Sequence, residues 1–215
     1  AAHCRHRVVH ATGDQAGAEI MRALINAAKL APHIEILERV VVEDLLTDDN
    51  GAVGGVLAYV VEKGERTLFE AAETILATGG LGGLYAVTTN PKPAQGHGLA
   101  FAARAGAVIR DPEFVQFHPT ALDIGEDPAP LATEALRGDG AVLVNANEKP
   151  FMQRYHRDRD LAPRDVVARA VEAEHAAGRG AFLDARRAIG ADFAKKFPTV
   201  FAACQRAGID PRIAL

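Results

Sequence analysis

The sequence has few cysteines, no long apolar run and no strong charge of either sign, and each absence excludes a class of protein. Only Cys4 and Cys204 occur among its 215 residues, at opposite ends of the chain. Two distant cysteines form neither a disulfide framework nor a zinc-binding pattern. No apolar run approaches the ~20 residues that span a bilayer, and the N-terminus has no signal-peptide pattern. We therefore expect a cytoplasmic protein that does not enter a membrane.

The formal net charge of −4 gives no reason to expect nucleic acid or an anionic membrane surface as a partner. The dinucleotide fingerprint G-x-G-x-x-G is also missing, both from Gly79 onward and from Gly96 onward. The pyrophosphate loop of any bound dinucleotide is therefore expected outside this segment. Because the chain starts AAHCRHRVVH, without an initiator methionine, and stops at GIDPRIAL, we expect a piece of a longer polypeptide.

What is present is typical of an ordinary globular protein, with 48% apolar and 24% charged residues. Periodicity and turn signals in the first half predict a strand at 7–11, a helix at 15–30 capped by Asp14, and one or two strands at 34–46. After a turn at 48–51 they predict a meander with strands at 56–61, 66–70 and 73–77, and then a helix at 98–105. This order indicates an α/β layer fold with a small antiparallel meander attached.

Asp-Pro and His-Pro dipeptides at 111–112 and 118–119 interrupt the chain, and we place a domain boundary near them. One domain is expected at 1–115 and another at 116–215. The second is predicted to contain a hairpin around 145–148, a helix at 164–177, a short strand at 182–185 and two short helices up to Ala207. On the first of these helices we expect Glu172 and Glu174 to form a solvated face.

The turn-rich stretch from Gln116 to Ala141 carries His118, Thr133, Glu134 and Arg137. Polar groups that a rigid scaffold presents on loops often hold a ligand, and an imidazole can donate a hydrogen bond or pair with an anion. Each residue also has a structural alternative. The imidazole can be satisfied within a packed loop, Thr133 and Glu134 can cap a helix, and Arg137 can form a surface ion pair in a turn.

Arg164 opens the predicted helix at 164–177, directly after Pro163, which suits the first helical position. A cation beside a helix N-terminus concentrates positive charge and so favours anion binding. The alternative is that Arg164 only pairs with Asp165 or Asp160.

The glycine-rich segment ATGGLGG, from Ala77 to Gly83, follows a predicted apolar strand. Glycines there let another group approach the backbone, and strand ends of α/β sheets are where nucleotides bind. The alternative is a plain turn. A metal site is not expected, although His3, Cys4, His6 and His10 are clustered, because no cysteine or carboxylate spacing supports one.

Several motifs in register resemble the L-aspartate oxidase family, within the succinate dehydrogenase and fumarate reductase flavoprotein superfamily. They are HCRHRVVHATGDQAG, EILERVVVEDLL, ATGGLGGLYAVTTNP, QFHPTAL, TEALRGDGA, FMQRYHRDRDLAPRDVVARAV and DFAKKFPTVFAACQRAGIDP. The resemblance implies an α/β plus α+β fold, with a partial Rossmann-like FAD-binding domain that carries the β-meander, followed by an α+β capping domain from about Gln116.

The resemblance also implies a reaction, in which L-aspartate gives a hydride to FAD and becomes iminoaspartate, and oxygen or fumarate reoxidises the flavin. The product leads through quinolinate to NAD, which makes quinolinate synthase an expected partner. The runner-up is a fumarate reductase or succinate dehydrogenase flavoprotein subunit, which needs a similar dicarboxylate site. A third reading is a split or non-catalytic flavoprotein segment. We expect residues 1–215 alone to be inactive and to bind FAD weakly or not at all.

Site residues follow from the resemblance position by position. It implies substrate binding by His118, Thr133, Glu134 and Arg164, catalytic roles for Arg164, Glu134 and Arg137, and flavin contacts at Val41, Val42, Ala77, Thr78, Gly79, Gly80 and His97. Two roles stay open for the arginines, an electrostatic clamp or a proton shuttle, because guanidinium hardly deprotonates in proteins. The family has aspartate where this chain has His97, which puts that flavin contact in doubt.

Overall fold

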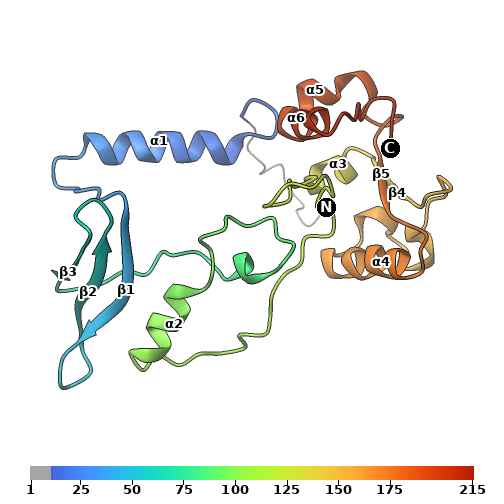
Figure 1. Ribbon diagram of the computed structural model, residues 1–215. Helices are drawn as coiled ribbons and strands as arrows, with labels where there is room; N and C mark the ends of the chain where they lie inside the picture. Colours follow the sequence, from blue (N-terminus) through green and yellow to red (C-terminus); the bar gives the residue numbers. More distant parts are fainter. Residues whose placement is uncertain (1–10) are drawn as a thin grey trace. The chain divides into compact units, whose positions relative to one another are not determined.

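The computed structural model describes residues 11–215, so most of the strand predicted at 7–11 lies outside the described residues. The chain divides into two compact units. One covers residues 25–115, and the other joins residues 116–215 to the described residues up to Leu24. Figure 1 labels the helices and strands of both units.

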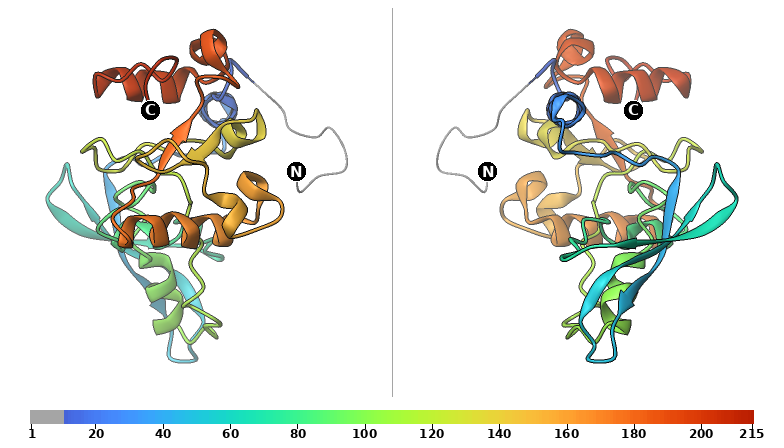
Figure 2. Two further views of the ribbon diagram at one scale, coloured as in Figure 1. Left: turned by 90° about the vertical axis from the view of Figure 1, so that its right-hand side faces the viewer. Right: turned by 90° about the vertical axis from the view of Figure 1, so that its left-hand side faces the viewer.

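A three-stranded antiparallel sheet forms most of the regular structure of the 25–115 unit, in the order β1-β2-β3. Its strands are β1 (Val40–Thr47), β2 (Val53–Val60) and β3 (Glu65–Glu70), and Figure 2 shows their twist. The Asp48 carboxylate closes the predicted turn between β1 and β2, because it accepts hydrogen bonds from the amides of Asn50 and Ala52 at 2.9 and 2.8 Å. The predicted meander is confirmed for these strands.

The strand predicted at 73–77 is wrong, because the structure contains no regular element there. A strand needs a neighbour that pairs with its backbone, and no described strand pairs with this segment. Its Ile75 side chain is 88% exposed. The strand predicted at 34–46 also begins late, because regular pairing starts only at Val40.

Helix α2 (His97–Arg104) confirms the helix predicted at 98–105. Its apolar face buries Phe101, which is 5% exposed. The Arg104 guanidinium donates to the Asp44 carboxylate at 3.0 Å, and this bond ties α2 to β1. The short 3-10 turn η1 (Gly82–Leu84) lies between the sheet and α2 in sequence.

Helix α1 (Ala16–Leu30) also agrees with prediction, although its cap does not. The Asp14 carboxylate accepts hydrogen bonds from the amide and hydroxyl of Thr199 at 3.2 and 2.8 Å. The apolar face of α1 is largely exposed among the described residues, with Ile20 at 57% and Leu24 at 60%.

In residues 116–215, a two-stranded antiparallel pair lies between helices on both sides (Figures 1 and 2). The pair is β4 (Val142–Val144) with β5 (Phe182–Asp184), and Leu143 stands opposite Leu183. The helical elements are α3 (Glu134–Gly138), η2 (Met152–Arg154), η3 (Arg159–Leu161), α4 (Arg164–Ala176), η4 (Gly190–Asp192), α5 (Phe193–Lys196) and α6 (Pro198–Arg206).

Two buried clusters form the core of this region, and Leu183 packs against both. One cluster is centred on Leu136, Phe193 and Val200 from α3, α5 and α6. The other contains Phe151 together with Val167 from α4. The predicted helices and the β5 strand are confirmed within one or two residues, and Val144 bridges Pro150 across the predicted hairpin turn.

The solvated face predicted for Glu174 is wrong, because its side chain is fully buried. It accepts hydrogen bonds from Arg154 at 2.6 Å, from the Tyr155 hydroxyl at 2.7 Å and from Arg179 at 2.7 Å. The bond from Arg179, together with Tyr155 and the Arg154 charge, outweighs burial and lowers the pKa of Glu174 to about 2. Glu172 is exposed, as predicted.

Candidate functional site

Four of the sequence-predicted polar residues form a cluster within residues 116–215. Three of them, His118, Arg137 and Arg164, surround the Glu134 carboxylate. The Arg164 Nε donates to Oε2 of Glu134 at 2.7 Å, and Nη2 of Arg137 lies 3.9 Å from Oε1. His118 lies within electrostatic range of all three charged groups. Two guanidinium groups, one carboxylate and one imidazole thus form a single cluster with an excess of positive charge.

Thr133 is the N-cap residue of α3, and its Oγ1 accepts a hydrogen bond from the Ala135 amide at 3.4 Å. The capping alternative for Thr133 is therefore confirmed. A hydroxyl that accepts one hydrogen bond can still donate its own hydrogen, so the cap leaves Thr133 able to donate to a ligand.

The surface ion pair predicted as the alternative for Arg137 is wrong, because the guanidinium is completely buried. Its Nη1 donates to the Asp160 carbonyl oxygen, while Nε and Nη2 are buried without a hydrogen-bond partner. Burial lowers the pKa of Arg137, although the negative charges of Glu134 and Asp160 act to raise it. Buried donors without acceptors are costly, and a bound carboxylate would supply the missing oxygens.

Arg164 is the first residue of α4, and Pro163 precedes it as the N-cap residue. Besides its bond to Glu134, the guanidinium donates from Nη1 to Oε1 of Gln116 at 3.1 Å. These two partners, from segments far apart in sequence, hold Arg164 at the edge of the cluster while about two fifths of its side chain stays exposed.

The two aspartates near Arg164 have other partners, so the alternative pairing is wrong. Asp165 accepts from Arg169 at 2.7 Å, one turn along the helix. The Asp160 carboxylate accepts from the Leu143 amide at 2.7 Å. Arg164 is therefore free of both neighbouring aspartates and pairs across the fold with Glu134.

The electrostatics of the cluster set two protonation states at neutral pH. Burial, followed by the positive charges of Arg164 and Arg137, lowers the pKa of His118 to about 4. Burial would raise the pKa of Glu134, but the hydrogen bond from Arg164 and both arginine charges outweigh it and leave that pKa below its usual range. The imidazole is therefore neutral and the carboxylate ionised around pH 7.

Sequence reasoning predicted no place in the cluster for Gln116 and Thr120, nor a bond from Arg137 to the Asp160 carbonyl, and the structure shows each of these contacts. Residues two apart on extended backbone share a face. Because Gln116, His118 and Thr120 follow this spacing, their alternation was a usable signal for the first two misses. Asp160 acts through its backbone carbonyl, which leaves no mark in the sequence.

The residues predicted to contact the flavin lie in the 25–115 unit. Val41 and Val42 belong to β1, and the Val41 side chain is 53% exposed. Their strand pairs with β2, with Val42 opposite Ala58. A cofactor that approaches this strand would meet partly exposed aliphatic side chains.

The predicted flavin loop, from Ala77 to Gly80, is exposed and packs against the start of α2. The Gly96 amide donates to the Gly80 carbonyl at 3.1 Å. A Cβ on Gly98 would overlap the Thr78 side chain, whereas one on Gly79 or Gly80 would meet open space. Because the loop is fixed on one side and open on the other, its backbone fits close approach by a flavin nucleotide.

His97 occupies the position where aspartate was expected. It is exposed, begins α2 and stacks on Phe101, with ring centroids 6.2 Å apart and an angle of 16° between the planes. Its side chain therefore packs along its own helix, and a direct contact with the flavin is left as a prediction.

Within residues 11–215 no cluster of three histidine, cysteine, aspartate or glutamate residues could hold a metal ion. His3, Cys4, His6 and His10 lie outside the described residues. Over the same range the structure contains no helix with both the length and the apolar character needed to cross a bilayer.

The chain belongs to the FAD binding domain family, whose model matches residues 1–214. Among curated relatives it is 61% identical to L-aspartate oxidase of Caulobacter vibrioides, over 99% of this chain and 41% of that protein. It is 50% identical to L-aspartate oxidase of Agrobacterium fabrum, over 98% of this chain and 40% of that protein. FAD is therefore the cofactor that family and relatives support.

Among solved structures, the chain is similar to an E. coli quinol fumarate reductase, with a TM-score of 0.79 and 30% identity over 93% of this chain and 37% of that one. It therefore shares the mixed helix and strand fold of the FAD-binding domain in fumarate reductase flavoproteins. The chain spans about two fifths of the length of the curated relatives it matches.

Proposed function

We propose that the full-length protein oxidises L-aspartate to iminoaspartate with FAD as the hydride acceptor, the first step of the quinolinate branch of NAD biosynthesis. The observation that carries this proposal is the cluster around Glu134, in which Arg137 has two buried donor groups without acceptors. A small dicarboxylate supplies the oxygens that such a cluster lacks. The L-aspartate oxidase relatives support aspartate as that dicarboxylate.

The chain's own residues would bind and orient the substrate. The neutral His118 imidazole donates one hydrogen bond to a carboxylate, and the Thr133 hydroxyl can donate another. Arg137 and Arg164 add positive charge, which stabilises a dianion in a site where an unpaired carboxylate would be costly. Ionised Glu134 keeps the Arg164 guanidinium in place by their 2.7 Å hydrogen bond.

FAD, when bound, supplies the acceptor for the hydride that leaves the substrate Cα. The chain's contribution to proton handling falls on the pair of Arg164 and Glu134 with Arg137 behind it. Burial lowers the pKa of Arg137, which is the direction that proton transfer requires. Guanidinium groups rarely deprotonate, so we assign the arginines first to the electrostatic clamp and second to a proton path.

The two predicted domains take complementary roles in this proposal. Residues 1–115 form part of a Rossmann-like FAD-binding domain, with Val41, Val42 and the loop from Ala77 to Gly80 toward the cofactor. Residues 116–215 form the capping domain that carries the dicarboxylate site. Oxygen or fumarate reoxidises the flavin, and quinolinate synthase consumes the product in the cytoplasm.

An anaerobic titration of the full-length protein tests the proposal. L-Aspartate is expected to bleach the flavin absorbance, and admission of oxygen is expected to restore it with formation of peroxide. Succinate serves as the matched four-carbon diacid without the amino group. Rapid bleaching by succinate with no response to aspartate would contradict the proposal and favour a fumarate reductase or succinate dehydrogenase flavoprotein, the second function that the structural similarity supports.

A further inference from the structure

Thr120 links the two loops that carry the proposed substrate-binding groups. It is 7% exposed, and all three of its polar groups form hydrogen bonds. Its amide donates to Nδ1 of His118 at 3.2 Å. Its hydroxyl donates to the Ala132 carbonyl at 2.7 Å, and its own carbonyl accepts from the Ala132 amide at 2.9 Å. One residue thus joins the His118 loop to the residue that precedes Thr133.

The bond from the Thr120 amide decides which ring nitrogen of His118 carries the hydrogen. In a neutral imidazole one nitrogen donates and the other accepts. Because Nδ1 accepts from Thr120, the hydrogen lies on Nε2. The imidazole therefore has a single donor group, Nε2–H, and this group is the one left for a carboxylate.

We propose that Thr120 is a positioning residue, which holds His118 as the Nε2–H tautomer and keeps its loop in register with Thr133 and Glu134. This inference rests on the proposed function, because it assigns Thr120 a role in the same dicarboxylate site. Thr120 itself reaches the substrate only through His118 and the Ala132 backbone.

The charges around His118 make the tautomer decisive. Arg164 and Arg137 face the imidazole together with Glu134, and with burial they lower the pKa of His118 to about 4. Since the ring is then neutral across the physiological range, it cannot attract a carboxylate by charge. Its contribution depends on the direction of one N–H group, and Thr120 fixes that direction.

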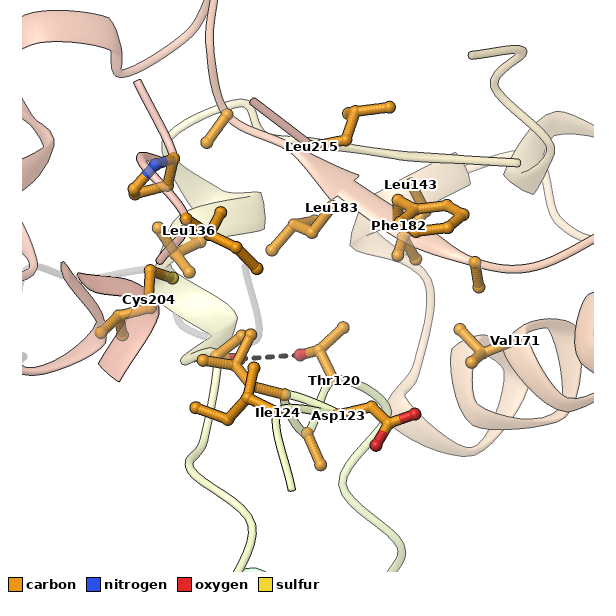
Figure 3. Close-up of a pocket in the computed structure, with 18 of the residues that line it drawn as sticks. Thr120, Asp123, Ile124, Leu136, Leu143, Val171, Phe182, Leu183, Cys204 and Leu215 are labelled. Carbon is orange, nitrogen blue, oxygen red and sulfur yellow. Dashed lines mark hydrogen bonds between the residues drawn. The ribbon is translucent and has the colours of Figure 1, made fainter. Parts of the chain in front are cut away.

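The surroundings of Thr120 allow a clean substitution. Thr120 lines a cavity of about 360 Å³, whose other walls are mostly apolar and include Leu136, Leu183 and Ile124. A dashed line in Figure 3 marks the hydrogen bond of the Thr120 hydroxyl, whose acceptor is the Ala132 carbonyl. Thr120→Val keeps the branched shape beside apolar neighbours and removes only the hydroxyl donor. Thr120→Ser keeps the hydroxyl and removes a methyl group.

Steady-state kinetics of the full-length holoenzyme give the first readout. Thr120→Val is expected to raise KM for L-aspartate about tenfold with kcat changed less than about threefold, because His118 binds ground and transition states alike. Thr120→Ser is expected to stay within about twofold of the wild type in both constants. Equal losses in the valine and serine variants would overturn the proposal, as would a wild-type KM in Thr120→Val.

Val200→Ala controls for general loss of stability. Val200 is 3% exposed in the core cluster that also contains Ala132 and Leu136, and it takes part in none of the hydrogen bonds of Thr120 and His118 described above. This variant is expected to lower the melting temperature without raising KM. A rise in KM equal to that of Thr120→Val, at a similar loss of stability, would show that unfolding alone explains the effect and would overturn the proposal.

Nitrogen-15 NMR of full-length protein labelled at histidine tests the tautomer without any substrate, and His118→Gln identifies the signals. At pH 7 the wild type and Thr120→Val are both expected to show unprotonated Nδ1 and protonated Nε2, because the substitution keeps the backbone amide that donates to Nδ1. Protonated Nδ1 in the wild type would overturn the proposal. Because this readout needs no turnover, it separates failure of the Thr120 role from failure of the aspartate oxidase assignment.

Discussion

Residues 116–215 and residues 25–115 differ sharply in how they present functional groups. All but two of the buried apolar side chains in the described part of the chain lie in 116–215, the exceptions being Ala58 and Phe101. The first region holds charged groups around Glu134 on this packed core. The second offers exposed backbone at Ala77 to Gly80 and leaves large apolar side chains such as Ile75 open.

This difference shows that a charged substrate site and a flavin-binding loop need different structural support. A cluster of charges keeps its geometry only where packing and hydrogen bonds lock each side chain, and 116–215 provides both. A flavin loop recognises its ligand largely through backbone, which requires glycines and a firm attachment on one side. The hydrogen bond from the Gly96 amide to the Gly80 carbonyl gives that attachment without a large core.

The largest effect is expected from removal of the Arg164 guanidinium in full-length protein. Arg164→Ala is expected to lower kcat/KM for aspartate by about 10³, because it removes a charge that stabilises the transition state and the hydrogen bond that Arg164 donates to Glu134. Arg169→Ala is the matched control on the same helix, since its side chain is 71% exposed, and it is expected to behave as wild type. A loss below tenfold in Arg164→Ala would break the assignment of the charged cluster to the substrate.

The second-largest effect is expected on stability, from the buried Glu174 on the helix that begins with Arg164. Glu174→Gln is expected to lower the free energy of unfolding by about 2 kcal/mol, less than for a fully buried ion pair, because Arg154 and Arg179 can reach water. Urea unfolding of the full-length protein measures this change, with the exposed Glu172→Gln as the control. Because the folded pKa of Glu174 is about 2 against an ordinary 4.5, its stabilisation is complete above pH 4.5 and is lost as pH falls toward 2. Equal stability of both variants would contradict this account.

A smaller effect is expected at the cofactor loop. Gly98→Ala forces Thr78 to move, and we expect FAD affinity to fall by about 1 kcal/mol, or roughly fivefold. Gly54→Ala is the control, because an added Cβ there meets nothing. The double variant with Thr78→Ala is expected to lose less than the sum of the single changes. FAD affinity is measured by flavin fluorescence. Strictly additive losses of affinity would show that packing between position 98 and Thr78 does not determine the conformation of the loop.

The smallest effect is a pH dependence of stability that comes from His118. Its pKa is about 4 in the fold against an ordinary 6.5, so the unfolded chain binds more protons between these values. The stability it contributes is complete above pH 6.5 and is lost as pH falls toward 4. With allowance for solvent screening we expect about 1 kcal/mol. His118→Gln should remove this slope, and an unchanged slope would place the titrating group elsewhere.

Local signals in the sequence predicted most helices and strands, because periodicity and turn residues act over a few positions. They failed at 73–77, where a strand depends on a partner that the described residues do not contain, and at Glu174, where an apparently polar face is buried by residues distant in sequence. The cap predicted at Asp14 was wrong for the same reason, because the Asp14 carboxylate accepts from Thr199, which is distant in sequence.

For the site, motif resemblance supplied the residues and the structure supplied their relations. Nothing local indicates that Arg137 is buried with two unpaired donors, or that Arg164 prefers Glu134 to its neighbour Asp165. The link from Thr120 to the Thr133 loop was not predictable, because it depends on a hydrogen bond to Ala132, which is distant in sequence.

A crystal structure of the full-length protein with a non-reacting four-carbon diacid tests the central claim most directly. We predict one carboxylate within about 3 Å of Nε of Arg137 or a guanidinium nitrogen of Arg164, and within hydrogen-bond reach of Nε2 of His118. A diacid bound elsewhere, with the Arg137 donors satisfied by protein atoms, would contradict the assignment of this cluster as the substrate site.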